Sequence, residues 1–178
     1  MLLYFLSILL AVTTPKGFVQ DDVHYGDFKS IYADNFGALY CIGNKDGVIK
    51  LGQAMDTSFT FENQSFAVSH IDVASPLKIL VYNANQNIVQ YLDRTLSEMS
   101  SVIRLDEVNI SAVNTVASSR DNAFWVFDQN NQELKKLTPG GVVINNSGNM
   151  LSIAGKNIEP CFLKESNSKV YLVDSVQG

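Results

Sequence analysis

Four acidic residues recur beside short apolar segments and are the side chains most suited to chemistry. Asp34, Asp72, Asp121 and Glu165 each lie in or next to such a segment and the polar connector after it. If the segments are equivalent strands, the four carboxylates would have similar heights around a channel, where oxygen ligands suit calcium or magnesium. The competing interpretation, which we favour, is that Asp and Asn fix turns here and that no metal or cofactor is bound.

Other catalytic constellations find no support in the sequence. The only imidazoles are His24 and His70, and neither has the neighbours or spacing of a zinc site. His70 begins a predicted strand, so we expect a structural role for it. The sequence also contains no G-x-S-x-G, P-loop or G-x-G-x-x-G motif. We therefore assign no catalytic residues.

The elements that would position these side chains form a repeat. Apolar anchor segments start at Leu39, Ile79, Phe124 and Val170, with steps of 40, 45 and 46 residues. A second apolar segment follows each of the first three anchors at the same distance, as expected for strand, tight turn and strand. This period is typical of a four-stranded propeller blade of about 40–50 residues.

Each anchor also has a leading strand before it. These strands are expected at residues 30–33, 70–73, 114–117 and 161–163, and Asn-, Asp- and Gly-rich turns separate them from the anchors. The segment 95–108 is only partly helical in pattern, so we interpret it as an outer strand and loop with a short helical turn. The sequence thus predicts an all-β propeller with units at 30–67, 68–111, 112–158 and 159–178.

The unit count predicts a partial propeller of about 3.5–4 blades. Propellers usually have four to eight blades. They close as a ring because an open one leaves sheet edges exposed. The last unit stops inside a hairpin, which favours a truncated piece of a longer propeller. The alternative is a small ring in which residues 20–30 complete the last blade.

Residues 1–12 are almost wholly apolar but too short to span a bilayer as a helix. We interpret residues 1–19 as a signal peptide, although no Lys or Arg precedes the apolar run, and residues 20–178 as the mature domain. The alternative is a buried N-terminal strand or helix. Export to the periplasm or the extracellular space is the resulting expectation, with no transmembrane span.

Composition limits the partners. A hydrophobic content of 46% is ample for a buried core, and a net charge of −5 with scattered basic residues argues against nucleic acid. Cys41 and Cys161 belong to distant units, so we expect two separate buried thiols, unless a small ring brings them together. Trp125 lies in an anchor with two apolar faces, so we expect it in the core, shielded from water, with Phe127 on the same face.

The second unit resembles an NHL-type propeller repeat. Asn83, Asn87, Gln90 and Asp93 match that family's pattern, whereas Ile88 replaces its usual Arg. The third unit resembles it more loosely, and the first and fourth more loosely still. The whole chain is similar to uncharacterised exported bacterial propeller proteins, a resemblance that implies a periplasmic or surface binding role.

Three functions remain open. We favour a non-catalytic binding or scaffolding module that recognises a protein, peptide or glycan through loops at one end of the blades. The first alternative is a metal-assisted hydrolase or lyase that uses the four carboxylates. The second is a structural subunit of a cell-envelope complex. Because propellers host many unrelated functions, the fold does not choose between them.

Overall fold

A computed structural model describes residues 25–52, 56–99 and 101–176. The predicted signal peptide, residues 1–19, lies outside the described residues. Within them, no helix is long and apolar enough to cross a membrane.

The chain forms three four-stranded antiparallel sheets followed by a two-stranded hairpin, each with its strands in sequence order. The first sheet contains β1 (Phe28–Ala33), β2 (Leu39–Gly43), β3 (Val48–Leu51) and β4 (Thr57–Phe61). The second contains β5 (His70–Asp72), β6 (Ile79–Asn83), β7 (Ile88–Leu92) and β8 (Ile103–Arg104). The third contains β9 (Val113–Ser118), β10 (Phe124–Asp128), β11 (Glu133–Leu137) and β12 (Val143–Asn149). The hairpin pairs β13 (Pro160–Ser166) with β14 (Lys169–Asp174).

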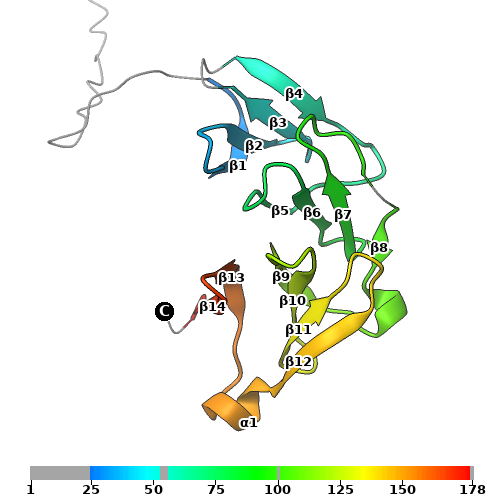
Figure 1. Cartoon of the computed structure of the whole chain (residues 1–178), viewed down its shortest axis with the longest axis vertical. Coiled ribbons are helices and arrows are strands. Elements are labelled where there is room, and N and C mark those ends of the chain that lie inside the picture. The colour runs from blue at the N-terminus through cyan, green and yellow to red at the C-terminus, as the bar shows by residue number, and fades with distance from the viewer. Residues whose placement is uncertain (1–24, 53–55, 100, 177–178) are drawn as a thin grey trace, which may run out of the picture.

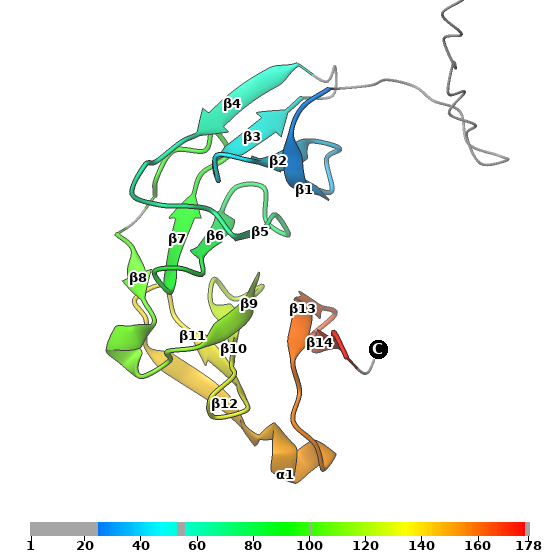
Figure 2. The ribbon, with the colours of Figure 1, turned by 180° about the vertical axis from the view of Figure 1, so that it is seen from behind.

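The sheets follow one another around an arc (Figures 1 and 2), with β1, β5, β9 and β13 on its concave side. Strands β4, β8 and β12 lie on the convex side. Every predicted leading strand and anchor coincides with a strand of the structure. The all-β fold and its repeating four-stranded unit are therefore confirmed, and we call the three sheets and the hairpin blades 1 to 4.

The core lies between neighbouring blades because the second strand of each four-stranded sheet, β2, β6 or β10, is an apolar run. In β6, Ile79 and Val81 pack toward blade 1, whereas Leu80 and Tyr82 pack toward blade 3. All five residues of this strand are buried. Burial of both faces of a central strand explains why the anchors are continuous apolar runs with no polar alternation.

The tight turn after each anchor strand also holds the chain that enters the next blade. Its residues Asp46, Asn87 and Gln132 have φ of 60°, 55° and 54°, a conformation that Asn and Asp tolerate well. The carbonyl of Asp46 accepts from the amide of Val68, at 2.8 Å. The Asn87 amide donates to the Ile110 carbonyl, at 2.5 Å. The side chain of Gln132 bonds both the amide and the carbonyl of Ile158. These turns therefore link successive blades.

Two segments between blades are irregular. The segment 95–108 contains β8 and a 3₁₀ turn, η1 (Asp106–Val108), as expected. The short helix α1 (Met150–Ala154) precedes blade 4 and was not predicted. Asn149 caps this helix by accepting from the Ser152 amide, and Gly155 ends it with φ of 73°. Five residues are too few for a visible 3.6-residue pattern.

The cysteine expectation is correct in one part and wrong in another. Cys41 and Cys161 are both free thiols, and Cys41 is buried, which raises its pKa. Cys161, in contrast, is exposed. It lies in β13, at the irregularity between Pro160 and Phe162 in the pairing with β14.

Candidate functional site

The predicted carboxylates all lie at one end of the blades. We call this end the connector face; it comprises the loops that join the first and second strands of each blade, residues 34–38, 73–78, 119–123 and 167–168. A cavity of about 690 Å³ opens here between the innermost strands of blades 1, 2 and 4. We call it the channel cavity. Asp34, Asp72 and Glu165 line it, whereas Asp121 does not.

The four carboxylates are not in equivalent positions. Glu165 pairs with the anchor residue Val170, and Asp72 pairs with Leu80, which comes one residue after its anchor. Asp34 and Asp121 lie beyond the ends of their strands. Among the described residues, no three His, Cys, Asp or Glu side chains lie close enough together to hold a metal ion.

Asp34 and Asp72 are bound within the protein, as the turn interpretation requires. Asp34 accepts from the amides of Phe36 and Ala38, at 2.9 and 3.0 Å, and from the hydroxyl of Tyr40, at 3.1 Å. Asp72 accepts from the amide of Ala74 in its own turn and from that of Ser118 in blade 3, both at 2.7 Å. These bonds fix the turn in blade 1 and attach blade 2 to blade 3.

Glu165 has a different task, because it joins blade 4 to blade 3. It accepts from the hydroxyl of Ser119, from the indole Nε1 of Trp125 at 2.6 Å, and from the amide of Arg120 at 3.4 Å. Burial alone would raise its pKa, but these hydrogen bonds and the charge of Lys136 outweigh burial and lower it. Glu165 is therefore ionised at neutral pH.

The expectation that Trp125 is shielded from water is wrong. Its face assignment is right, because Trp125 packs with Phe127 against blade 4 while Phe124 and Val126 pack against blade 2. The indole is nevertheless only half-buried and borders a cavity of about 330 Å³, which we call the tryptophan cavity. The Nζ of Lys136 lies 5.0 Å from the ring centroid. The neighbour of the indole Nε1 is the carboxylate of Glu165 and not an apolar side chain.

Arg120 is the central residue of the connector face. It borders the channel cavity, the tryptophan cavity and a third cavity of about 300 Å³ between blades 2 and 3. Its backbone amide is bound to Glu165, but its guanidinium makes no hydrogen bond or ion pair with any described residue. Lys136, by comparison, is paired with Asp121 at 2.7 Å, and together with a hydrogen bond from Ser119 it lowers the pKa of that carboxyl to about 2.

His70 has the structural role that we expected. Its Nδ1 lies 3.3 Å from the hydroxyl of Tyr32, and the two rings meet edge to face. Burial lowers the pKa of His70 despite the opposing effects of Asp72 and of a hydrogen bond to the backbone of Val116. A neutral imidazole thus contacts the innermost strands of three blades.

Solved structures with the same arrangement of blades are known. A streptogramin B lyase aligns with a TM-score of 0.59 at 15% identity, over 84% of this chain and 48% of its own. The fold is that of a β-propeller. Virginiamycin B lyase from Staphylococcus aureus gives 0.57 at 11% over the same shares, and Ycf48 bound to D1 peptide gives 0.62 at 8%, over 83% and 47%.

This chain therefore spans about half the length of the propellers that it matches, and it is a partial propeller. At these identities the likeness concerns the fold alone. No protein-family model matches the sequence, and no curated protein matches it.

Sequence reasoning missed Arg120 as a site residue, because a lone Arg in a polar connector carries no signal. A usable signal was present in the strands beside it. Trp125 pairs across strands with Lys136, and Tyr40 pairs with Lys50, whose Nζ lies 5.2 Å from the tyrosine ring centroid. A repeated aromatic–lysine pair at one strand position marks the connector face as polar and cationic.

Proposed function

We propose that this protein is a non-catalytic binding module that recognises a peptide segment of a partner protein on its connector face. The observation that carries the proposal is Arg120, which lines three adjoining cavities and whose guanidinium has no partner among the described residues. A charged group in such a place gains most from an incoming hydrogen-bond acceptor.

The neighbouring carboxylates favour binding over metal-assisted chemistry. Asp34, Asp72 and Glu165 already accept hydrogen bonds from backbone and side-chain donors. To bind a metal, these carboxylates would have to give up those hydrogen bonds, and this cost opposes a role as metal ligands. Among the solved propellers, Ycf48 is bound to a peptide, which is a precedent for this kind of ligand on this fold.

We also propose that the protein is an exported propeller of the NHL-like kind. Asn83 and Asp93, which carry the resemblance to NHL-type repeats, bond the amides of the turns that follow them, at 3.1 Å for Gln86 and 2.7 Å for Thr95. We place the protein in the periplasm or outside the cell on the basis of the apolar residues 1–12. N-terminal sequencing of exported protein should find processing near residue 19, and an intact Met1 would contradict this.

Peptide selection followed by fluorescence titration tests the proposed function. A random-sequence phage-displayed peptide library is selected on the full chain, and synthetic copies of the enriched peptides are titrated in solution. Trp125 is the only tryptophan and borders the tryptophan cavity, so bound peptide should change its emission in a saturable way.

Matched arginine variants locate the site. Loss of hydrogen bonds to a charged group costs about 1.5–3 kcal/mol, so Arg120→Ala should weaken peptide binding by about ten- to a hundredfold. Arg104→Ala changes the same residue type on the outer strand β8 and should bind as wild type does. If no peptide is enriched, or if Arg120→Ala binds equally well, the proposal fails. Saturable binding of neutral oligosaccharides in place of peptides would replace it with glycan recognition.

A further inference from the structure

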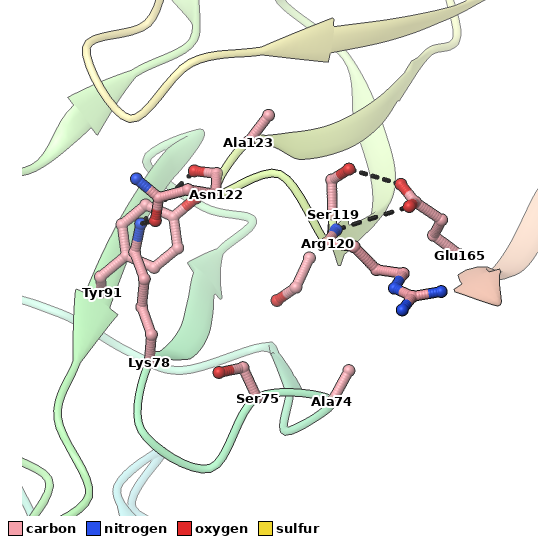
Figure 3. A pocket seen from close by; sticks show the side chains of 10 residues that line it. Ala74, Ser75, Lys78, Tyr91, Ser119, Arg120, Asn122, Ala123 and Glu165 are labelled. Carbon is pink, nitrogen blue, oxygen red and sulfur yellow. Dashed lines mark hydrogen bonds between the residues drawn. The ribbon is translucent and has the colours of Figure 1, made fainter. Parts of the chain in front are cut away.

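The cavity between blades 2 and 3 has the features of a specific subsite. We call it the inter-blade pocket; its volume is about 300 Å³, near the lower end for ligand pockets. Lys78 from the β5–β6 connector, Tyr91 from β7 and Ser118 at the end of β9 are among its lining residues. Figure 3 shows the Lys78 side chain running up to the ring of Tyr91, with Asn122 beside them.

Two hydroxyl groups in this pocket have no hydrogen-bond partner. Tyr91 is only 2% exposed, and neither its hydroxyl nor that of Ser118 is bonded to any described residue. Buried polar groups are almost always hydrogen-bonded, and an unsatisfied one costs about 1–3 kcal/mol. Burial and the charge of Asp72 raise the pKa of Tyr91, so its hydroxyl stays protonated and can donate a hydrogen bond to a ligand.

The charges around the pocket favour an anion. Lys78 Nζ lies 3.8 Å from the ring centroid of Tyr91 and is bound only to the neutral Asn122. Arg120 is the second cation of the lining and lies on its blade 4 side, with the guanidinium directed away from Lys78 and Tyr91 (Figure 3). Glu165 is the one acid among the lining residues, and the neighbours described above already occupy its oxygens.

We propose that the inter-blade pocket binds a carboxylate, supplied by an Asp or Glu side chain of the bound peptide. A carboxylate offers up to four acceptor sites, and Lys78, Tyr91 and Ser118 supply donors on the walls that blades 2 and 3 contribute to the pocket. The choice of a peptide as the source of the carboxylate rests on the proposed function.

Isothermal titration with two small probes tests the chemistry of the pocket. The α-methylamides of N-acetyl-L-glutamate and N-acetyl-L-glutamine have nearly the same shape, and only the glutamate probe carries a carboxylate. We expect the glutamate probe to bind the full chain in the millimolar range and the glutamine probe to bind at least tenfold more weakly. Equal affinity for the two probes would overturn the proposal.

Removal of single hydroxyls tests whether the carboxylate binds in the inter-blade pocket. Tyr91→Phe keeps the ring under Lys78 and removes an unsatisfied group, so it should raise the melting temperature slightly while weakening the glutamate probe at least threefold. Thr115→Val removes another buried, unsatisfied hydroxyl, which lines none of the three cavities. Thr115→Val should leave probe affinity unchanged. If Tyr91→Phe also leaves the affinity unchanged, the carboxylate does not bind here.

The peptide selection distinguishes the carboxylate pocket from the proposed peptide recognition. Enriched peptides should contain an Asp or Glu, and its replacement by Asn or Gln should weaken binding at least tenfold. If peptides bind through Arg120 without any acidic residue, peptide recognition stands and the carboxylate pocket fails. If the glutamate probe binds and Tyr91→Phe weakens it while no peptide is enriched, the pocket stands and the proposed function fails.

Discussion

Trp125 shows how one side chain can both stabilise the core and border a binding surface. Its ring packs in the cluster between blades 3 and 4, while its Nε1 is bound to Glu165 at the connector face. Phe127, on the same face of β10, is 0% exposed. The two residues therefore differ in burial within one strand.

This difference gives a stability prediction. Phe127→Ala should cost about 3–5 kcal/mol, as for other large-to-small core changes. Trp125→Ala removes a half-buried ring and one hydrogen bond, so it should cost less, about 1–3 kcal/mol. Urea unfolding of both variants measures this. A loss for Trp125→Ala as large as that for Phe127→Ala would mean that the indole is core after all.

Asp128 gives the protein a defined sensitivity to acid. Burial would raise the pKa of this fully buried carboxyl, but hydrogen bonds from Lys135, at 2.6 Å, and from Asn131 lower it. With a folded-state pKa below the unfolded value of about 3.9, its contribution is present above that pH and is lost as the pH falls through the folded pKa. The pKa of Glu165 shifts in the same direction.

We therefore expect stability to be nearly constant from pH 7 to 5 and to fall below about pH 4. Asp128→Asn should lower the free energy of unfolding at pH 7 by about 1.5–3 kcal/mol and reduce the loss in acid. Urea unfolding at pH 7, 5 and 3 measures both effects. A variant with the full acid loss of the wild type would contradict this role of Asp128.

At the scale of elements, the turn after β10 holds blade 4 in place. Gln132 accepts from the amide of Ile158, at 2.7 Å, and donates to the carbonyl of the same residue, at 3.2 Å. Blade 4 has only two described strands, so it depends more on this tether than the other blades do.

Gln132→Ala should therefore loosen blade 4 selectively. Loss of these bonds leaves the amide of the half-buried Ile158 without its partner, at about 1–3 kcal/mol, while its carbonyl still accepts from the side chain of Gln129. Hydrogen exchange should become faster for the amides of β13 and β14 and stay unchanged for β5 to β7. Asn130→Ala, in the same turn but exposed, serves as the control. Equal acceleration in all blades would mean that Gln132 supports the whole domain and not this junction.

The sequence predicted the elements well because the repeat has a physical cause. Strands such as β6 are buried on both faces, so they must be continuous apolar runs, and their tight turns must use residues that tolerate positive φ. The helix α1 was missed because five residues carry no periodicity. The positions of the leading and anchor strands and of the turns between them thus follow from sequence pattern alone.

The site was harder to predict because it depends on contacts between blades. Asp72 and Glu165 each bind residues about 46 positions away, and such pairing leaves no local pattern. Trp125 was expected in the core because both faces of its strand are apolar. Its indole instead donates a hydrogen bond to Glu165 of the next blade. Arg120 became a candidate only when three cavities were seen to meet around it.

At the scale of the whole molecule, the central claim is that the connector face, and not the opposite end of the blades, binds the ligand. The turns after β2, β6 and β10 lie at that opposite end and tether the blades, as Asn87 and Gln132 do. The connector face has instead the free guanidinium of Arg120. The two ends can be distinguished amide by amide.

Hydrogen–deuterium exchange of the full chain, with and without a selected peptide, tests this claim most directly. We expect slower exchange in residues 74–78 and 119–123 on binding, and no change in residues 43–47, 83–87 and 128–132. Protection confined to the latter three turns would contradict the account and place the ligand at the other end of the propeller.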